Sequence, residues 1–132
     1  MMTDDNRRDI VNYRIEKANK TLDDAQKNLN YGMYNVAANR LYYAFYYAAS
    51  ALLISNKIEA HTHSGIQTMM HLHFIKTGKL TVEEGVLMRQ LFTLRQESDY
   101  EDFIDIQQED LNDILPSTIN LGHQQQRHLR AG

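Results

Sequence analysis

The segment from Arg95 to Tyr100 combines side chains that could bind a phosphate group. Arg95 and Asp99 are four residues apart, so in a helix they lie one turn apart on one face and can form an ion pair. An exposed pair of this kind contributes only about 0 to 1 kcal/mol to stability. Its value for function would be that the carboxylate orients the planar guanidinium toward a phosphate. An ordinary ion pair at a helix end explains the same spacing.

Two residues elsewhere in the chain could contribute to such a site. Arg40 is followed three and seven residues later by Tyr43 and Tyr47, so its guanidinium could lie over an aromatic ring or reach an anion. His63 stands at the expected start of a helix, where its imidazole could hydrogen-bond to a neighbouring helix. Structural roles explain both patterns as well: a cation-π contact or buried ion pair for Arg40, and a hydrogen bond that holds the turn for His63.

The usual signatures of enzyme active sites are missing from the sequence. It has no glycine-rich phosphate loop, no nucleophile elbow and no histidine pair at the spacing of helical metal ligands. His71 and His73 are two residues apart, so in a helix they point to nearly opposite sides. The chain has no cysteine, which excludes disulfides, thiolate zinc sites and cysteine nucleophiles. We therefore expect neither a metal ion nor a cofactor.

A hairpin of two helices is predicted for the first part of the chain. Between about residues 5 and 30 the apolar residues recur at alternating spacings of three and four, which indicates an amphipathic helix, and Gly32 is a suitable left-handed stop. From Leu41 to Ile54 the chain carries no charge and is apolar on more than one side. This pattern predicts a central helix with two packing partners: the first helix, and either a later helix or a second copy of the chain.

Two further helices are indicated by capping residues. Thr62 or Ser64 can cap a third helix that runs to about Lys76. Thr81 and Glu84 form a capping box that opens a fourth helix, and this helix ends near Ser98 or Asp99.

A fifth helix should contain the apolar residues between Leu111 and Leu121, with a kink at Pro116. The polar tail from 124 to 132 is expected to fray. The fold class is therefore all-α, an up-and-down bundle of about five helices with a kinked last helix.

The composition fits one helical domain over residues 1–132, with its core at about 10–122. One proline and six glycines in 132 residues argue for helices. With 17 acidic against 14 basic residues and no basic run, an extended DNA-binding surface is not expected. The N-terminus lacks the apolar core of a signal peptide, and the central helix is too short and too rich in tyrosine for a membrane span. We expect a cytoplasmic protein without membrane contact.

Four segments in this order and spacing resemble the HEPN domain, most closely its small stand-alone bacterial and archaeal branch: 39–46, 62–65, 74–78 and 95–100. The resemblance covers roughly residues 10–122. It implies an up-and-down helical bundle that pairs into a homodimer.

The resemblance also implies a range of functions. Many HEPN proteins are ribonucleases or toxins, often encoded beside a minimal nucleotidyltransferase that acts as antitoxin, and others bind nucleotides or RNA. Their catalytic signature is an arginine followed a few residues later by a histidine, with two copies facing each other across the dimer. Arg95 matches the arginine, but Tyr100 stands where the histidine would be. A histidine with a pKa of about 6.5 exchanges protons at neutral pH, whereas a tyrosine with a pKa of about 10 stays protonated.

Three hypotheses follow. The first is a dimeric HEPN module, the toxin-like or regulatory part of a two-protein toxin-antitoxin or defence system, which binds RNA or a nucleotide through Arg40, His63, Arg95, Asp99 and Tyr100. The second is a metal-independent endoribonuclease that uses Arg95 and Tyr100, with His63 or another residue as the base. The third is a structural adaptor that recruits another protein.

Overall fold

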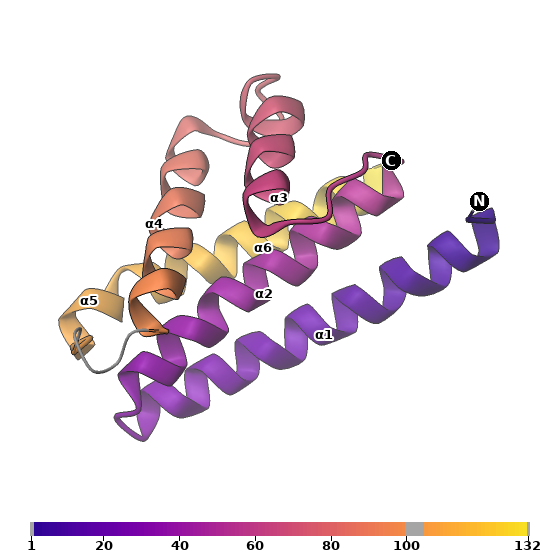
Figure 1. Cartoon of the computed structure of the whole chain (residues 1–132). Helices are drawn as coiled ribbons and strands as arrows, with labels where there is room; N and C mark the ends of the chain where they lie inside the picture. Colours follow the sequence, from indigo (N-terminus) through magenta and orange to yellow (C-terminus); the bar gives the residue numbers. More distant parts are fainter. Residues whose placement is uncertain (1, 100–104, 132) are drawn as a thin grey trace.

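The chain begins with a hairpin of two long helices. The computed structural model describes residues 2–99 and 105–131. Helix α1 (Asp4–Asn30) is followed by α2 (Tyr34–Ser55), which returns antiparallel beside it (Figure 1). Gly32 between them has a φ of 75°, a left-handed conformation that glycine adopts without strain. The predicted hairpin and its glycine stop are confirmed.

The middle of the chain forms a second pair of helices that crosses α2 steeply (Figure 1). Thr62 caps α3 (His63–Met70), which continues without a break into the π-helical turn η1 (His71–Ile75). The predicted capping box of Thr81 and Glu84 opens α4 (Val82–Ser98), with both of its hydrogen bonds formed.

The last helix is broken where proline requires it. Pro116 lacks an N–H, and its ring clashes with the carbonyl of the residue four positions earlier, which is Asn112. Helix α5 (Gln108–Asn112) ends at that residue, and α6 (Ile114–Ala131) begins after Asp113. The last helix is bent by 26°. The predicted kink is confirmed.

The tail corrects one expectation. Residues 124–131, which we expected to fray, are helical and belong to α6. Gln125 is fully buried, Gln126 Nε2 donates a hydrogen bond to Asn19 Oδ1 at 2.8 Å, and His128 Nε2 lies 2.7 Å from the carbonyl oxygen of Lys79. Contacts with distant parts of the chain therefore hold a segment whose local sequence is polar.

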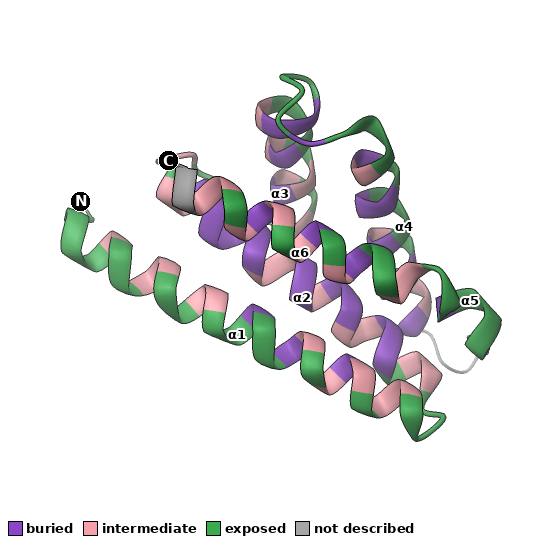
Figure 2. Ribbon diagram, turned by 180° about the vertical axis from the view of Figure 1, so that it is seen from behind, coloured by how far each residue is buried: buried purple, intermediate pink, exposed green. Residues whose placement is uncertain are grey.

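Helix α2 is the centre of the bundle. It contacts α1, α3, α4, α5 and α6, and most of its length is buried (Figure 2). Alanines such as Ala38 and Ala49, both fully buried, allow neighbouring helices to approach closely, while Tyr42 and Phe45 fill the space between them. The second apolar face of α2 is thus covered by later helices of the same chain. The all-helical bundle predicted from the sequence is confirmed.

Candidate functional site

A chain of polar contacts joins the end of α4 to the first half of α2. Arg40 donates hydrogen bonds from Nε and Nη2 to Asn39 Oδ1, at 3.2 and 2.7 Å. Asn39 Nδ2 lies 3.4 Å from Asp99 Oδ1, and Asp99 Oδ2 lies 3.5 Å from Arg95 Nε. We call these four residues the arginine cluster. The structure therefore brings together Arg40 and Arg95, which the sequence places 55 positions apart.

The guanidinium of Arg95 is only partly engaged. Its side chain is 24% exposed, and it lies over the ring of Tyr42 at 5.9 Å from the ring centre. The contact with Asp99 is too long for a strong hydrogen bond, and Nε is buried with no acceptor among the described residues. A guanidinium that is fixed by an ion pair and an aromatic face, with donors to spare, is suited to bind a phosphate.

His63 adjoins this cluster through Tyr42. The imidazole Nδ1 lies 2.8 Å from the Tyr42 hydroxyl, and the ring packs 4.7 Å from the ring of Tyr46. The local sequence fixes this position, because the Thr62 hydroxyl accepts a hydrogen bond from the N–H of Gly65 and thereby starts α3 at His63. With Nδ1 occupied by Tyr42, only Nε2 is left to contact a ligand.

The electrostatics of the site keep both rings uncharged. Burial, followed by the positive charge of Arg95, lowers the pKa of His63, while Asp99 opposes this shift. Burial raises the pKa of Tyr42, so its hydroxyl stays protonated. At neutral pH, His63 is therefore a neutral imidazole beside a fixed positive charge.

Four of the five predicted site residues lie in the arginine cluster or beside it. The structure brings together Arg40, His63, Arg95 and Asp99, whereas Tyr100 lies outside the described residues. The structural roles that we considered are also present, since Arg40 lies over the ring of Tyr43 at 5.2 Å and Arg95 pairs with Asp99.

Sequence reasoning missed two members of the site, Asn39 and Tyr42. Tyr42 lies in the core, and in addition its hydroxyl contacts His63 and its ring contacts Arg95. The only sequence signal for Asn39 was its position next to Arg40.

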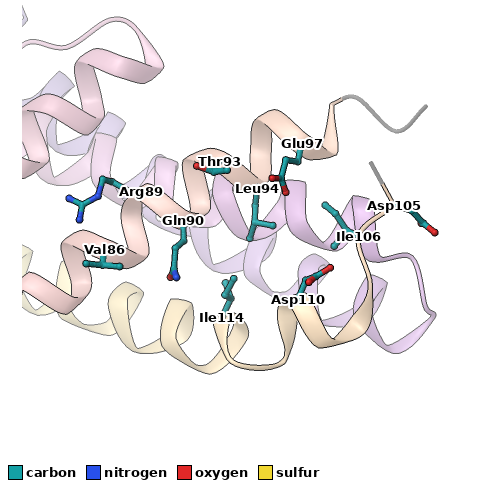
Figure 3. A pocket seen from close by; sticks show the side chains of 10 residues that line it. All are labelled: Val86, Arg89, Gln90, Thr93, Leu94, Glu97, Asp105, Ile106, Asp110 and Ile114. Carbon is teal, nitrogen blue, oxygen red and sulfur yellow. The ribbon is translucent and has the colours of Figure 1, made fainter. Parts of the chain in front are cut away.

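A groove between α4 and the α5–α6 segment is a different surface (Figure 3). It has a volume of about 450 Å³, and its lining includes the carboxylates of Glu97, Asp105 and Asp110 against the single cation Arg89. This balance disfavours a phosphate. Arg40, His63, Arg95 and Asp99 do not line it.

The described residues contain neither a group of metal ligands nor a membrane-spanning helix. Within residues 2–99 and 105–131, no three histidine, cysteine or acidic side chains are grouped so that they could hold a metal ion. Over the same residues, no helix has both the length and the apolar character needed to cross a membrane.

Known proteins resemble the chain over most of its length. The model of the HEPN domain matches residues 11–123. A UPF0332 protein of Thermotoga maritima is 33% identical over 106 residues, which are 80% of each chain. A protein of Methanocaldococcus jannaschii that is named a "putative toxin" is 36% identical over 101 residues, which are 76% of this chain and 69% of that protein.

A solved structure shows the same fold. The crystal structure of TT1696 from Thermus thermophilus superposes with a TM-score of 0.76, covering 89% of this chain and 97% of that one. At 16% identity this likeness concerns the fold alone. Because the family model covers most of the sequence, the chain belongs to the HEPN domain family.

Proposed function

We propose that this HEPN protein binds a phosphate group of RNA or of a nucleotide at the arginine cluster. The observation that carries the proposal is the convergence of Arg40 and Arg95 from two helices. Asn39 and Asp99 join them, and the side chain of Arg95 is still 24% exposed. A pre-positioned guanidinium loses little freedom when it binds an anion. Tyr43 and Tyr46, half-buried beside the cluster, offer rings on which a base could stack.

The biological setting that we propose is a two-protein toxin-antitoxin system. The support is the name of the relative from Methanocaldococcus jannaschii, together with membership of the HEPN family. In this setting the chain is the toxin-like or regulatory component and acts as a homodimer. Its partner is an antitoxin, for which a minimal nucleotidyltransferase is our candidate.

A binding assay with three variants tests the proposal. The affinity for a labelled single-stranded RNA and for a mononucleotide is measured for Arg95→Gln, Arg95→Lys and the control Arg89→Gln, whose side chain is exposed on α4. We expect Arg95→Gln to weaken binding by more than about tenfold, because a charge-assisted hydrogen bond contributes roughly 1.5 to 3 kcal/mol. Arg95→Lys should rescue only part of the loss, since lysine lacks the planar fork. Equal affinities of Arg95→Gln and Arg89→Gln would refute the proposal.

Cleavage of RNA is a second candidate function, favoured by the position of His63. Tyr42 contacts both His63 and Arg95, so the imidazole of His63 lies near the guanidinium. Because its pKa is lowered, this imidazole is neutral and can accept a proton at neutral pH. In this scheme His63 would act as the base and Arg95 would stabilise charge on the phosphate. The test is cleavage of mixed RNA in chelator by wild type, His63→Gln and Arg95→Gln. RNA that stays intact at enzyme excess would exclude this function and leave binding alone.

A further inference from the structure

A second cationic cavity lies toward the other end of α2. It has a volume of about 520 Å³, within the range of about 300 to 1,000 Å³ that is usual for small-ligand sites. Residues from the N-terminal half of α1, the C-terminal half of α2 and the connection to α3 line it, at the end where α1 and α2 diverge in Figure 1. Arg14 reaches α2 at Ser50, ten residues beyond Arg40 and so about 15 Å farther along the helix. The cavity is therefore distinct from the arginine cluster.

The charges around this cavity are unbalanced. Its lining includes three cations, Arg7, Arg14 and Lys57, against one carboxylate, Glu59. Both arginines are half-buried, and among the described residues neither forms an ion pair with a carboxylate. A guanidinium withdrawn from water without a counter-charge is costly, and an anion would offset that cost.

Both arginines are nevertheless held in place. Arg14 Nη1 donates a hydrogen bond to the hydroxyl of Ser50, which is 5% exposed, at 2.8 Å. Arg7 Nη1 donates to the carbonyl oxygen of Ile54 near the end of α2, at 2.9 Å, and its Nε is buried with no acceptor among the described residues. These bonds use one terminal nitrogen of each guanidinium and leave the other terminal nitrogen for a ligand.

The rest of the lining is apolar. It includes aliphatic side chains from α1, α2, the connection to α3 and α3 itself: Ile10, Leu53, Ile58 and Ile66. The ring of Tyr46 also lines the cavity. Inorganic phosphate alone would leave this apolar surface uncovered, whereas a ligand with an apolar or aromatic body would bury it.

We propose that this cavity binds a small organic anion, whose phosphate or carboxylate pairs with Arg7 and Arg14 while its body covers the aliphatic wall. The inference does not rest on the proposed function, because none of the four residues of the arginine cluster lines the cavity, although Tyr46 adjoins both. A nucleoside phosphate and a short lipid-like phosphate share this chemistry.

Calorimetry with three probes tests the assignment: adenosine monophosphate, octyl phosphate and inorganic phosphate. We expect at least one of the two organic anions to bind more than about tenfold tighter than inorganic phosphate. Adenosine monophosphate as the tight ligand would indicate a nucleotide, and octyl phosphate a lipid-like anion. If neither organic anion binds more tightly than inorganic phosphate, the proposal is overturned.

Variants then locate the bound anion. Arg14→Gln and Arg7→Gln should each weaken binding by about tenfold or more, because each removes a charge-assisted hydrogen bond. Arg89→Gln, at the groove of Figure 3, should leave the affinity unchanged, and Arg95→Gln reports separately on any binding at the arginine cluster. Melting curves verify that each variant is folded. If Arg14→Gln does not fold, the affinity of Arg7→Gln still tests the proposal. Loss of binding in Arg95→Gln, with none in Arg7→Gln, would place the anion at the arginine cluster and overturn the inference.

The NMR signals of isoleucine methyl groups locate the bound anion without any mutation. Ile58 and Ile66 line this cavity, whereas Ile114 lines the acidic groove between α4 and the α5–α6 segment. The bound anion should shift the signals of Ile58 and Ile66 and leave that of Ile114 in place. The opposite pattern would contradict the assignment.

Discussion

At the scale of single residues, Tyr42 connects the two kinds of chemistry at the candidate site. Its buried ring lies under the guanidinium of Arg95, and its hydroxyl contacts His63 Nδ1. Tyr42 is the only ring between Arg95 and His63 in this chain of contacts. Removing the positive charge of Arg95 should therefore change the pKa of His63.

The titration of His63 measures this link. Since burial and Arg95 lower its pKa, His63 should titrate below the ordinary value of about 6.5, and Arg95→Gln should raise its pKa. Between the lowered pKa and the ordinary value of about 6.5, the folded state binds fewer protons than the unfolded state. The contribution of His63 to stability is therefore fully present above about pH 6.5 and is lost as the pH falls through the lowered pKa. The measurement is the imidazole NMR signal against pH. If Arg95→Gln leaves the pKa of His63 unchanged, the link from Arg95 through Tyr42 to His63 would be contradicted.

The sequence predicted the site at this scale only where the spacing was local. The pair Arg95 and Asp99 follows from one helical turn. The bond between Asn39 and Asp99 joins residues 60 positions apart, and no periodicity within one helix contains that information. The sequence pattern marks Tyr42 as a core residue, and it is buried in the core. Its hydroxyl contacts His63 only because α3 places that histidine beside it, which the pattern within α2 does not contain.

At the scale of elements, local rules accounted for the helices and failed at the tail. Caps, glycine stops and the proline break are encoded within a few residues, and the structure shows them at Gly32, Thr62, Thr81 and Pro116. The glutamine-rich end of α6 is polar in sequence, yet packing against the rest of the bundle makes it helical. Tertiary contacts of this kind override local propensity.

Gln125 allows a prediction about this packing. Its side chain is fully buried, and both its oxygen and its nitrogen lack hydrogen-bond partners among the described residues. Gln125→Met keeps the size and removes the polar atoms, so we expect the free energy of unfolding to rise by about 1 to 3 kcal/mol. Urea denaturation measures the change, with Gln124→Met on the half-exposed face as control. A destabilised Gln125→Met would mean that the amide has partners after all.

At the scale of the whole molecule, one surface near the candidate site remains apolar. Met33 and Val36, 53% and 36% exposed, lie within two helical turns of Arg40 at the start of α2, and Tyr31 beside them is 82% exposed. The buried faces of α2 are already covered by the chain's own helices, so this exposed surface is where we expect a second copy to pack. A dimer formed there would bring two arginine clusters near each other.

The mass in solution tests the dimer. We expect light scattering to give twice the 15.4 kDa of the single chain, and Val36→Asp to shift the mass toward the monomer, since it places a charge in the interface. Val82→Asp, at the 70% exposed start of α4, is the matched control and should remain a dimer. A wild-type protein with the mass of one chain would contradict the prediction.

The central claim is that Arg40 and Arg95 form one phosphate-binding site, and a charge-matched comparison tests it most directly. The affinity for a labelled single-stranded RNA is measured for Arg40→Gln/Arg95→Gln and for Arg89→Gln/Arg127→Gln, in which both replaced side chains are exposed elsewhere. Both double variants lose two positive charges, so a non-specific electrostatic effect would weaken them about equally. Our account predicts a loss of more than about tenfold for the first variant and little change for the second. Equal affinities of the two double variants would contradict it.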